Sequence, residues 1–222
     1  MNKPTPLSIK PLLAAREISF HGCRIELRPS GALFFPDFSA LAVADLHLGK
    51  ALHFSAAGMF LPPYESDATL HKLDAEAQAT GAAKILLLGD AFHSTRLTAD
   101  PDFLPRMIKF LARRAAPVFV LGNHDRPLAR ALEKLSCALH EEWRVDVIRL
   151  RHEPDALAGP QIFGHLHPCA RVATRAGKQR RPCFVVGAET IVMPAFGALT
   201  GGLCVTSAAL APFALGAELY LI

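Results

Sequence analysis

The amino-acid sequence predicts a layered α/β fold in which residues 1–222 form a single domain. Three observations lead to this prediction. Short apolar runs, typical of fully buried strands, recur along the chain and end in turns. Segments with helical character separate these runs, and such alternation indicates layers of helices and strands. Hydrophobic residues make up 51% of the 222 residues, which is enough for a large core.

The N-terminal part of the chain predicts an arm followed by strands. Residues 1–20 contain two lysines and an apolar stretch broken by prolines, which makes a poor secretory signal, so we expect a loose arm. Residues 17–43 predict several short strands, with turns at His21–Gly22 and Ser30–Gly31.

Three later segments predict helices. The first covers residues 64–80, with Pro62–Pro63 before it and Gly81 after it as a stop. The second covers residues 100–115, with Asp100 as the candidate N-cap and Pro101 in the first position. The third covers residues 126–139. The remaining C-terminal part, in residues 183–196 and 203–222, has β-branched runs broken by Gly and Pro, which predict returning strands of a second sheet.

The composition excludes some classes of protein. No uninterrupted apolar run reaches the ~18 residues of a membrane span, so no membrane contact is expected. The five cysteines are odd in number and include no Cys-x-x-Cys pair, which argues against a disulfide framework and for a reducing cytoplasm. The net charge of +4 is mild and does not by itself identify a nucleic-acid-binding protein.

Polar side chains follow the apolar runs at the point where each run ends. In "LAVADLHLGK", "KILLLGDAFHS", "PVFVLGNHDR", "VIRLRHEPD" and "QIFGHLHP" the run gives way to Asp, Asn or His. Because sites of open α/β sheets form beyond the carboxyl ends of the strands, we expect these side chains to converge. They are Asp45, His47, Asp90, Asn123, His124, His152, His165 and His167.

Two carboxylates, an amide oxygen and several imidazoles in one crevice predict a metal site. Mixed oxygen and nitrogen ligands suit Mn, Fe or Zn better than Ca or Mg. There are too many candidate ligands for one ion, and two ions ~3.5–4 Å apart could share them through one carboxylate. Such a pair would hold the attacking and leaving oxygens of an in-line phosphoryl displacement.

The order of these motifs resembles that of the calcineurin-like metallophosphoesterase superfamily. Between Asp45 and His167 the chain shows Asp-x-His, Gly-Asp, Gly-Asn-His-Asp, a single His and Gly-His-x-His. The resemblance implies a four-layer β-sandwich flanked by helices, with a dimetal centre at the carboxyl ends of the strands. It implies two divalent metal ions, Mn²⁺ in the first place, with Fe or Zn as alternatives.

The same resemblance implies a role for each candidate residue. The first ion would be held by Asp45, His47, Asp90 and His167. Asp90 would bridge to the second ion, whose other ligands would be Asn123, His152 and His165. His124 would contact the substrate phosphate and would not bind a metal ion.

A finer resemblance concerns "DLHLGK", "GDAFHS", "GNHDR", "GHLHP" and "MPAFGALTGG". Together they look like the short bacterial family of ligase-associated DNA damage response endonucleases. His93, three positions after Asp90, resembles the histidine that partners the catalytic one in DNA repair nucleases of the superfamily. The resemblance implies a Mn-dependent DNA endonuclease that works in DNA repair with a DNA ligase and a helicase-like protein. His93 would hold His124 in its tautomer and orientation.

Substrate contacts outside the metal motifs are less defined. A basic loop, "ARVATRAGKQRRP", directly follows the last metal motif, and a charge run of this kind is either a solvated turn or a contact for DNA phosphates. Any such binding would be largely independent of base sequence. Lys50 is equally consistent with a solvated helix position and a phosphate contact. The candidate substrate-binding residues are Lys50, Arg171, Arg175, Arg180 and Arg181.

Two other functions stay open, and some polar residues are expected to have ordinary roles. A phosphatase or pyrophosphatase acting on a nucleotide or lipid-linked diphosphate would use the same metal chemistry, although "GDAFHS" and the basic loop favour a nuclease. A non-catalytic scaffold of the same fold would lack the histidine that stands here at His124. Asp125 is expected to tie down the Gly122 turn. Four histidines outside the motifs are expected at the surface or in the core: His21, His53, His71 and His140.

Overall fold

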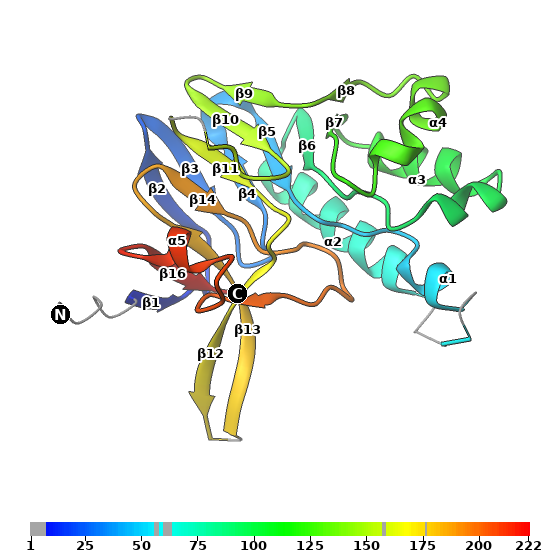
Figure 1. The fold of residues 1–222 in the computed structure, drawn as a ribbon. Coiled ribbons are helices and arrows are strands. Elements are labelled where there is room, and N and C mark those ends of the chain that lie inside the picture. The colour runs from blue at the N-terminus through cyan, green and yellow to red at the C-terminus, as the bar shows by residue number, and fades with distance from the viewer. Residues whose placement is uncertain (1–7, 56–57, 60–63, 157–158, 176) are drawn as a thin grey trace.

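Two β-sheets lie face to face in the computed structural model of the protein (Figure 1). The structure describes residues 8–55, 58–59, 64–156, 159–175 and 177–222. The start of the expected N-terminal arm and Pro62–Pro63, expected before the first helix, lie outside the described residues.

The first sheet has seven strands in the order β2-β3-β4-β5-β6-β7-β8. Its antiparallel half, from β2 to β5, matches the short strands and turns predicted for residues 17–43. From β5 to β8 the strands are parallel, so their carboxyl ends meet at one edge. The bounds are β2 Arg16–Phe20, β3 Cys23–Leu27, β4 Leu33–Phe35, β5 Ala40–Val43, β6 Lys84–Leu88, β7 Ala116–Val120 and β8 Leu139–His140.

The second sheet has nine strands, seven of them in the order β1-β16-β13-β14-β11-β10-β9, while β12 pairs with β13 and β15 pairs with β12. β10, β11 and β14 are parallel neighbours. Its strands are β1 Ser8–Pro11, β9 Trp143–Val145, β10 Ile148–Arg151, β11 Gln161–Phe163, β12 Pro168–Thr174, β13 Gly177–Val186, β14 Thr190–Val192, β15 Leu203–Cys204 and β16 Glu218–Leu221. The expectation of a loose N-terminal arm is wrong for residues 8–11, because β1 pairs in parallel with β16.

α2, α3 and α4 agree with the three predicted segments but are shorter, whereas α5 is a correction, because it forms within residues 203–222, where only strands were predicted. α2 fits its prediction, and Gly81 ends it in the left-handed region at φ 63°. The second helix starts later than predicted, because Thr95–Ala99 forms a 3₁₀ turn and the Asp100 carboxylate accepts a hydrogen bond from the Asp102 amide. The third begins as a 3₁₀ turn. The bounds are α1 Lys50–Ser55, α2 Glu65–Thr80, α3 Phe103–Leu111, α4 Ala129–Lys134, α5 Ala211–Ala214, and the 3₁₀ turns η1 Pro36–Phe38, η2 Thr95–Ala99 and η3 Arg126–Leu128.

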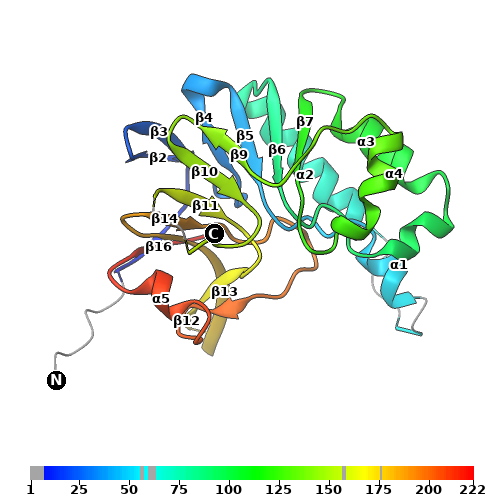
Figure 2. The ribbon, with the colours of Figure 1, turned by 45° about the horizontal axis from the view of Figure 1, so that its top comes forward.

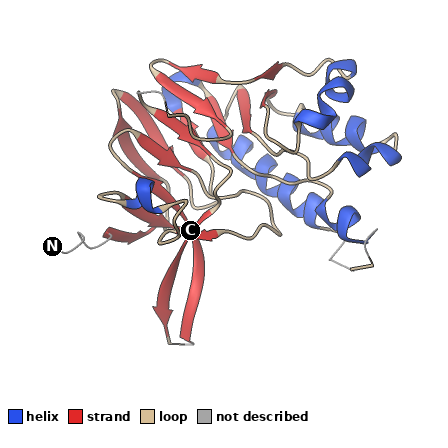
Figure 3. Cartoon of the chain, in the orientation of Figure 1, coloured by secondary structure: helices blue, strands red, loops and turns tan. Residues whose placement is uncertain are grey.

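Three buried clusters hold the layers together. Leu70 of α2 packs against Leu87 of β6 on the helical side of the seven-stranded sheet. Leu88 of the same strand packs between the two sheets, because successive side chains of a strand point to opposite faces. On the far face of the nine-stranded sheet, Val185 belongs to a cluster with Ala214 of α5. The layers are therefore helix, sheet, sheet and helix, as predicted, and the fourth layer is only the short α5 (Figures 2 and 3).

A hairpin formed by β12 and β13 extends away from the sandwich (Figure 1). The sequence pattern predicted a basic loop here, and this is corrected: the basic residues lie on the strands of a regular antiparallel ribbon, except Arg175, which lies in its turn. Among the helices of the described residues, none combines the length and apolar character needed to cross a membrane.

Candidate metal centre

Candidate ligands from both sheets converge at the carboxyl ends of their strands. Asp45, Asp90 and Asn123 follow the parallel strands β5, β6 and β7 of the seven-stranded sheet. His152 and His165 follow β10 and β11 of the other sheet. The backbone ties the turns together, since the Asp45 amide donates to the Gly89 carbonyl at 3.1 Å. The side chains predicted from separate motifs thus gather where the two sheets meet.

The turns at these strand ends hold five candidate ligands in the left-handed backbone region. The φ angles are 55° at Asp45, 48° at His47, 50° at Asp90, 62° at His165 and 43° at His167. For a residue other than glycine, a strained conformation of this kind costs ~1–3 kcal/mol. Strain of this kind tends to cluster at functional sites, where the surrounding structure enforces it. Its concentration on one set of ligand-type residues marks this edge of the sandwich as functional.

Two glycines leave the space that the ligands occupy. A Cβ at Gly89 would lie 2.1 Å from Nδ1 of His152, and one at Gly122 would lie 2.2 Å from Oδ1 of Asp90. Both distances are far below van der Waals contact, so a larger residue would displace a ligand. The glycine in each strand-end motif therefore has a steric reason to be there.

Asp45 presents a buried carboxylate oxygen that lacks a hydrogen bond. The residue is fully buried, and its Oδ2 accepts from the His165 amide at 2.9 Å. Its Oδ1 lies 3.2 Å from Nε2 of His167, yet no described residue donates a well-aligned hydrogen bond to it. Burying such a group without a partner is unfavourable. A cation between Asp45, His47 and His167, whose ligand atoms all lie within 4.8 Å of one another, would satisfy it.

A second group of ligand atoms surrounds Nε2 of His152. This nitrogen lies 3.0 Å from Oδ1 of Asn123, 3.1 Å from Nδ1 of His165 and 3.5 Å from Oδ2 of Asp90. Asp90 also groups with His47 on its other side, so its carboxylate stands between the two sets. That is the position expected of a shared ligand.

Hydrogen bonds behind the imidazoles orient them for metal binding. Nδ1 of His152 lies 3.2 Å from the Leu88 carbonyl, and Nδ1 of His167 lies 3.1 Å from the Gly201 carbonyl. When Nδ1 donates to a carbonyl, Nε2 keeps its lone pair for a metal. Burial lowers the pKa of His47 to about 3, so this ring is neutral, as a metal ligand must be. The mixed oxygen and nitrogen donors of the described residues fit divalent ions such as Mn, Fe or Zn.

His124 lies beside this cluster and is more exposed. Its backbone amide donates to Oδ1 of Asp90 at 2.9 Å, and its side chain is 39% exposed. Its Nε2 is 3.9 Å from Oδ2 of Asp90, and its ring groups with His47 and Asp90 as a possible metal ligand. The geometry therefore permits two roles for this ring, a substrate contact or a metal contact.

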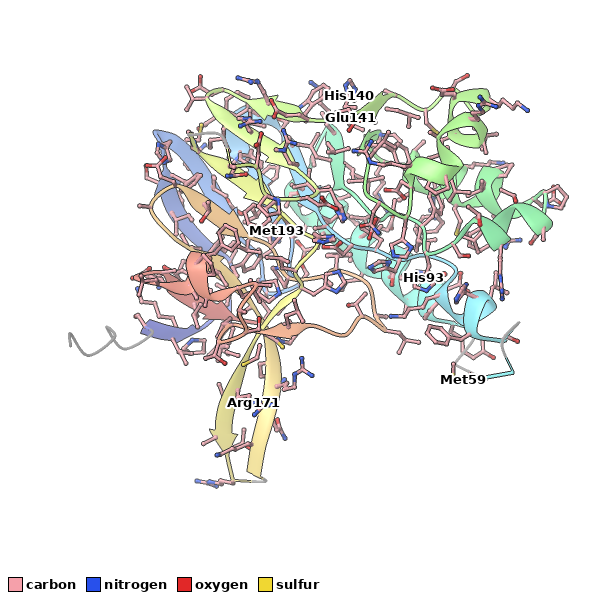
Figure 4. The ribbon with its side chains drawn as sticks, viewed as in Figure 1. Met59, His93, His140, Glu141, Arg171 and Met193 are labelled. Atoms are coloured by element: carbon pink, nitrogen blue, oxygen red, sulfur yellow. The ribbon has the colours of Figure 1, made fainter. Side chains whose placement is uncertain are left out.

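His93 contacts His124 by ring stacking. The two centroids are 5.3 Å apart and the planes are inclined by 18°. The only hydrogen-bond contact that His93 makes with another side chain within the described residues is between its Nδ1 and Nδ1 of His47, at 3.4 Å. The arrangement differs from a dyad in which His93 bonds to His124, although a role in positioning His124 stays a prediction. Figure 4 labels His93 close to α1.

Asp125 joins two turns in place of contacting the ligands. Its side chain is buried, and its oxygens accept from the amides of Ala91, Phe92 and Gly122 at 3.1–3.2 Å. The carboxylate thus holds the turn after β6 against the turn after β7. This agrees with the structural role expected of Asp125 and extends it. Burial raises the pKa of the carboxyl to about 6.

Two residues at the site were missed in the sequence. His53 of α1 was expected outside the site, but its ring packs edge-on against His93 with centroids 5.0 Å apart. Its Nδ1 is buried and has no hydrogen-bond partner among the described residues. Glu153 groups with His152 and His165, and only its position directly after His152 could have indicated this. The remaining histidines outside the motifs contact other parts of the chain: His21, His71 and His140.

The predicted substrate contacts lie at different distances from the cluster. Lys50 is partly buried and its Nζ donates to the Leu199 carbonyl at 2.8 Å, so its contact with a phosphate stays a prediction. Arg180 donates to the Gly202 carbonyl and lines a cavity of about 230 Å³ together with His167. The other three residues are exposed on the hairpin and are not brought into the cluster: Arg171, Arg175 and Arg181.

Comparison with known proteins supports this reading of the fold. The chain matches no known family profile and no curated protein. It is similar to the crystal structure of the nuclease MPE of Pseudomonas putida, with a TM-score of 0.76 and 29% identity, covering 93% of this chain and 96% of the other. The phosphoesterase YfcE of E. coli has a TM-score of 0.42 and 19% identity, covering 74% and 83% of the two chains. The likeness to the nuclease agrees with the predicted metallophosphoesterase-type fold, and the finer resemblance to ligase-associated endonucleases stays a prediction.

Proposed function

We propose that this protein is a metal-dependent phosphodiesterase that cleaves DNA strands internally, with Mn²⁺ as its metal. The observation that carries the proposal is the convergence of carboxylates, an amide oxygen and imidazoles around Asp90. The similarity of the whole fold to a nuclease supports a nucleic acid as the substrate.

The proposed ligands divide around the carboxylate of Asp90. One ion would be held by Asp45, His47, Asp90 and His167, and the other by Asp90, Asn123, His152 and His165. When bound, a pair of divalent ions lowers the pKa of water and neutralises charge on a phosphate. Two observations support this division: Oδ1 of Asp45 accepts no hydrogen bond from a described residue, and Asp90 lies between the two groups of ligand atoms.

His124 is proposed to act on the leaving oxygen. Its ring is partly exposed, while its backbone is fixed to Asp90, so it can face a bound phosphodiester without entering the core. An imidazole in this place can give a proton to the departing alkoxide and so accelerate its loss. Stacking on His93 restricts the plane of the His124 ring, which would keep the proton donor aimed at the substrate.

The biological setting follows from the sequence resemblance alone. We extend the proposal to a role in DNA repair with a DNA ligase and a helicase-like protein, in the cytoplasm. All five cysteines are free thiols, which supports a reducing compartment. Co-purification with the ligase and the helicase-like protein from cell extracts would test the association.

A metal screen tests the proposed activity. Protein stripped with EDTA is supplied with Mn, Mg, Fe or Zn and assayed on single-stranded DNA, duplex DNA, bis-p-nitrophenyl phosphate and nucleoside diphosphates. We expect no activity without metal, and greater activity with Mn than with Mg. Full activity in EDTA would contradict the metal dependence, and hydrolysis of nucleoside diphosphates alone would favour a pyrophosphatase.

A further inference from the structure

The β12–β13 hairpin concentrates positive charge without compensation. Between Pro168 and Val186 the chain has five basic residues and no acidic one. Elsewhere some basic side chains meet carboxylates, as Arg24 meets Asp37, but no other described stretch of this length groups so many basic residues without an acidic one. None of the five forms an ion pair with a residue that the structure describes. They are Arg171, Arg175, Lys178, Arg180 and Arg181.

The strand register sorts these residues onto two faces. Arg171 lies directly opposite Arg180, and Lys178, two residues before Arg180, lies on the same face. Arg181, which the sequence pattern grouped with the candidate substrate contacts, lies on the other face, opposite the buried Ala170, so we assign it no part in binding. Like charges directly opposite each other on a sheet are destabilising. An anion bound across this face would relieve that repulsion.

The basic face begins beside the candidate metal centre. Arg180 lines the same cavity as His167, whose Nε2 faces Asp45. From Cys169 at the base to Thr174, the ribbon extends outward by about 17 Å at 3.3 Å per residue. Figure 4 shows Arg171 on this projecting hairpin. A length of ~17 Å spans roughly five phosphates of a stacked strand, which rises about 3.4 Å per nucleotide.

The arginines on the Asn123 side of the centre differ from those of the hairpin. A smaller cavity of about 60 Å³ there is lined by Asn123, Arg126 and Arg151. Both arginines are already engaged: Arg126 pairs with Glu141, and Arg151 pairs with Glu142 at 2.9 Å. The arginines that line this cavity are therefore paired with carboxylates, whereas those of the hairpin are not.

We infer that the face formed by Arg171, Lys178 and Arg180 is a binding arm for the phosphate backbone of a DNA strand that leaves the metal centre on the His167 side. The inference rests on the proposed phosphodiesterase function. A nucleic acid fits better than an acidic peptide or a membrane surface, because the face is narrow, regularly charged and continuous with the metal centre. Contact with phosphates alone makes this arm indifferent to base sequence.

A pair of matched variants tests the arm. Arg171→Ala/Lys178→Ala removes two charges from the basic face, and Arg181→Ala removes an equally exposed charge from the other face. Each protein is loaded with Mn²⁺ and assayed for kcat/KM on a 24-nucleotide single strand and on bis-p-nitrophenyl phosphate at several salt concentrations. Each phosphate contact to a single strand adds ~0.7 to the salt slope, which is about fivefold in affinity at 0.1 M salt.

We expect the double variant to lose ~25-fold more activity on the oligonucleotide than on the small substrate, with a salt slope shallower by ~1.4. Arg181→Ala is expected to change the ratio of the two activities by less than about twofold. Equal losses in the two proteins would show a general charge effect and overturn the arm. A double variant that cleaves the oligonucleotide as the wild type does would also overturn the arm. Binding to polyglutamate and to acidic vesicles is measured in parallel, and loss of that binding while DNA cleavage persists would overturn it as well.

Direct binding separates this inference from the proposed function. If wild-type protein cleaves neither substrate, the proposed function fails, and the arm is then judged by fluorescence anisotropy with a labelled single strand. Weaker binding by the double variant and normal binding by Arg181→Ala would still support the arm. Unchanged melting temperatures of all three proteins establish that they are folded.

Discussion

Gly164 and Asp45 pack directly against each other across the two sheets. A Cβ added at Gly164 would lie 2.4 Å from Oδ2 of Asp45, the oxygen that also accepts a hydrogen bond from the amide of the next residue, His165. Gly164 follows β11 of the nine-stranded sheet, and Asp45 follows β5 of the seven-stranded sheet. Because Gly164 has no side chain, the carboxylate of Asp45 can occupy the space beside the end of β11.

Gly164→Ala should therefore displace Asp45 and weaken metal binding. Forcing an extra carbon into a packed region typically costs ~1–3 kcal/mol. We expect a lower melting temperature and fewer ions per chain, measured by calorimetry and elemental analysis. Gly201→Ala is the control, because a Cβ at Gly201 meets nothing within 4 Å. Full metal content in Gly164→Ala would show that Asp45 is not a required ligand.

Asp90→Asn should remove both ions and not only one. The carboxylate of Asp90 stands between the two groups of ligand atoms, and an amide of the same shape lacks the charge that two cations share. The amide oxygen can still accept the hydrogen bond from the His124 backbone, so the turn should stay folded. Elemental analysis gives the number of ions per chain. A variant that still holds two ions would exclude Asp90 as the bridge.

His124→Ala should leave metal content and melting temperature close to those of the wild type. Loss of a general acid costs ~10²–10⁴-fold in rate, and the loss should fall mainly on kcat. It should be larger on DNA, whose departing alkoxide needs a proton, than on bis-p-nitrophenyl phosphate, whose p-nitrophenolate hardly does.

Two other outcomes of the His124→Ala experiment assign different roles to this ring. Equal losses on both substrates would indicate charge stabilisation in place of proton transfer. Loss of metal would show that His124 is itself a ligand, a role that its distance of 3.9 Å from Asp90 permits.

His53→Ala should lower kcat without changing metal content. The ring of His53 packs edge-on against His93, which stacks on His124, so its removal loosens the support of the proposed acid. We expect roughly a tenfold loss, less than a gross misplacement of the reacting groups would cause. His53→Phe restores an aromatic edge and should recover most of the rate. If both variants match the wild type, His53 has no part in positioning.

Local patterns were sufficient to predict the strand ends and the residues gathered there. Each candidate ligand follows a buried run and a turn, and parallel strands bring such turns to one edge. Asp90 and Asn123 could therefore be expected near each other from separate motifs. The same logic holds for α2, which has a clear stop at Gly81.

The features that were missed depend on partners distant in the chain. β1 is a strand only because β16 lies beside it, and nothing in Ser8–Pro11 itself signals that pairing. The outer part of β13 has no buried face, so the alternation of apolar and polar residues that marks a strand is absent there. His53 lies on a six-residue helix, and its contact with His93 arises from tertiary packing alone.

The division of the candidate ligands between two sheets has a consequence for biosynthesis. A nascent chain emerging from the ribosome completes the seven-stranded sheet first, and with it Asp45, Asp90 and Asn123. The nine-stranded sheet, which carries His152 and His165, closes only when β16 reaches β1. At ~5–20 residues per second, the roughly 100 residues between Asn123 and β16 take about 5–20 s to make. Under the proposed assignment of ligands, His152 and His165 are made after Asp45, Asp90 and Asn123, so loading of the second ion would follow synthesis of the nine-stranded sheet.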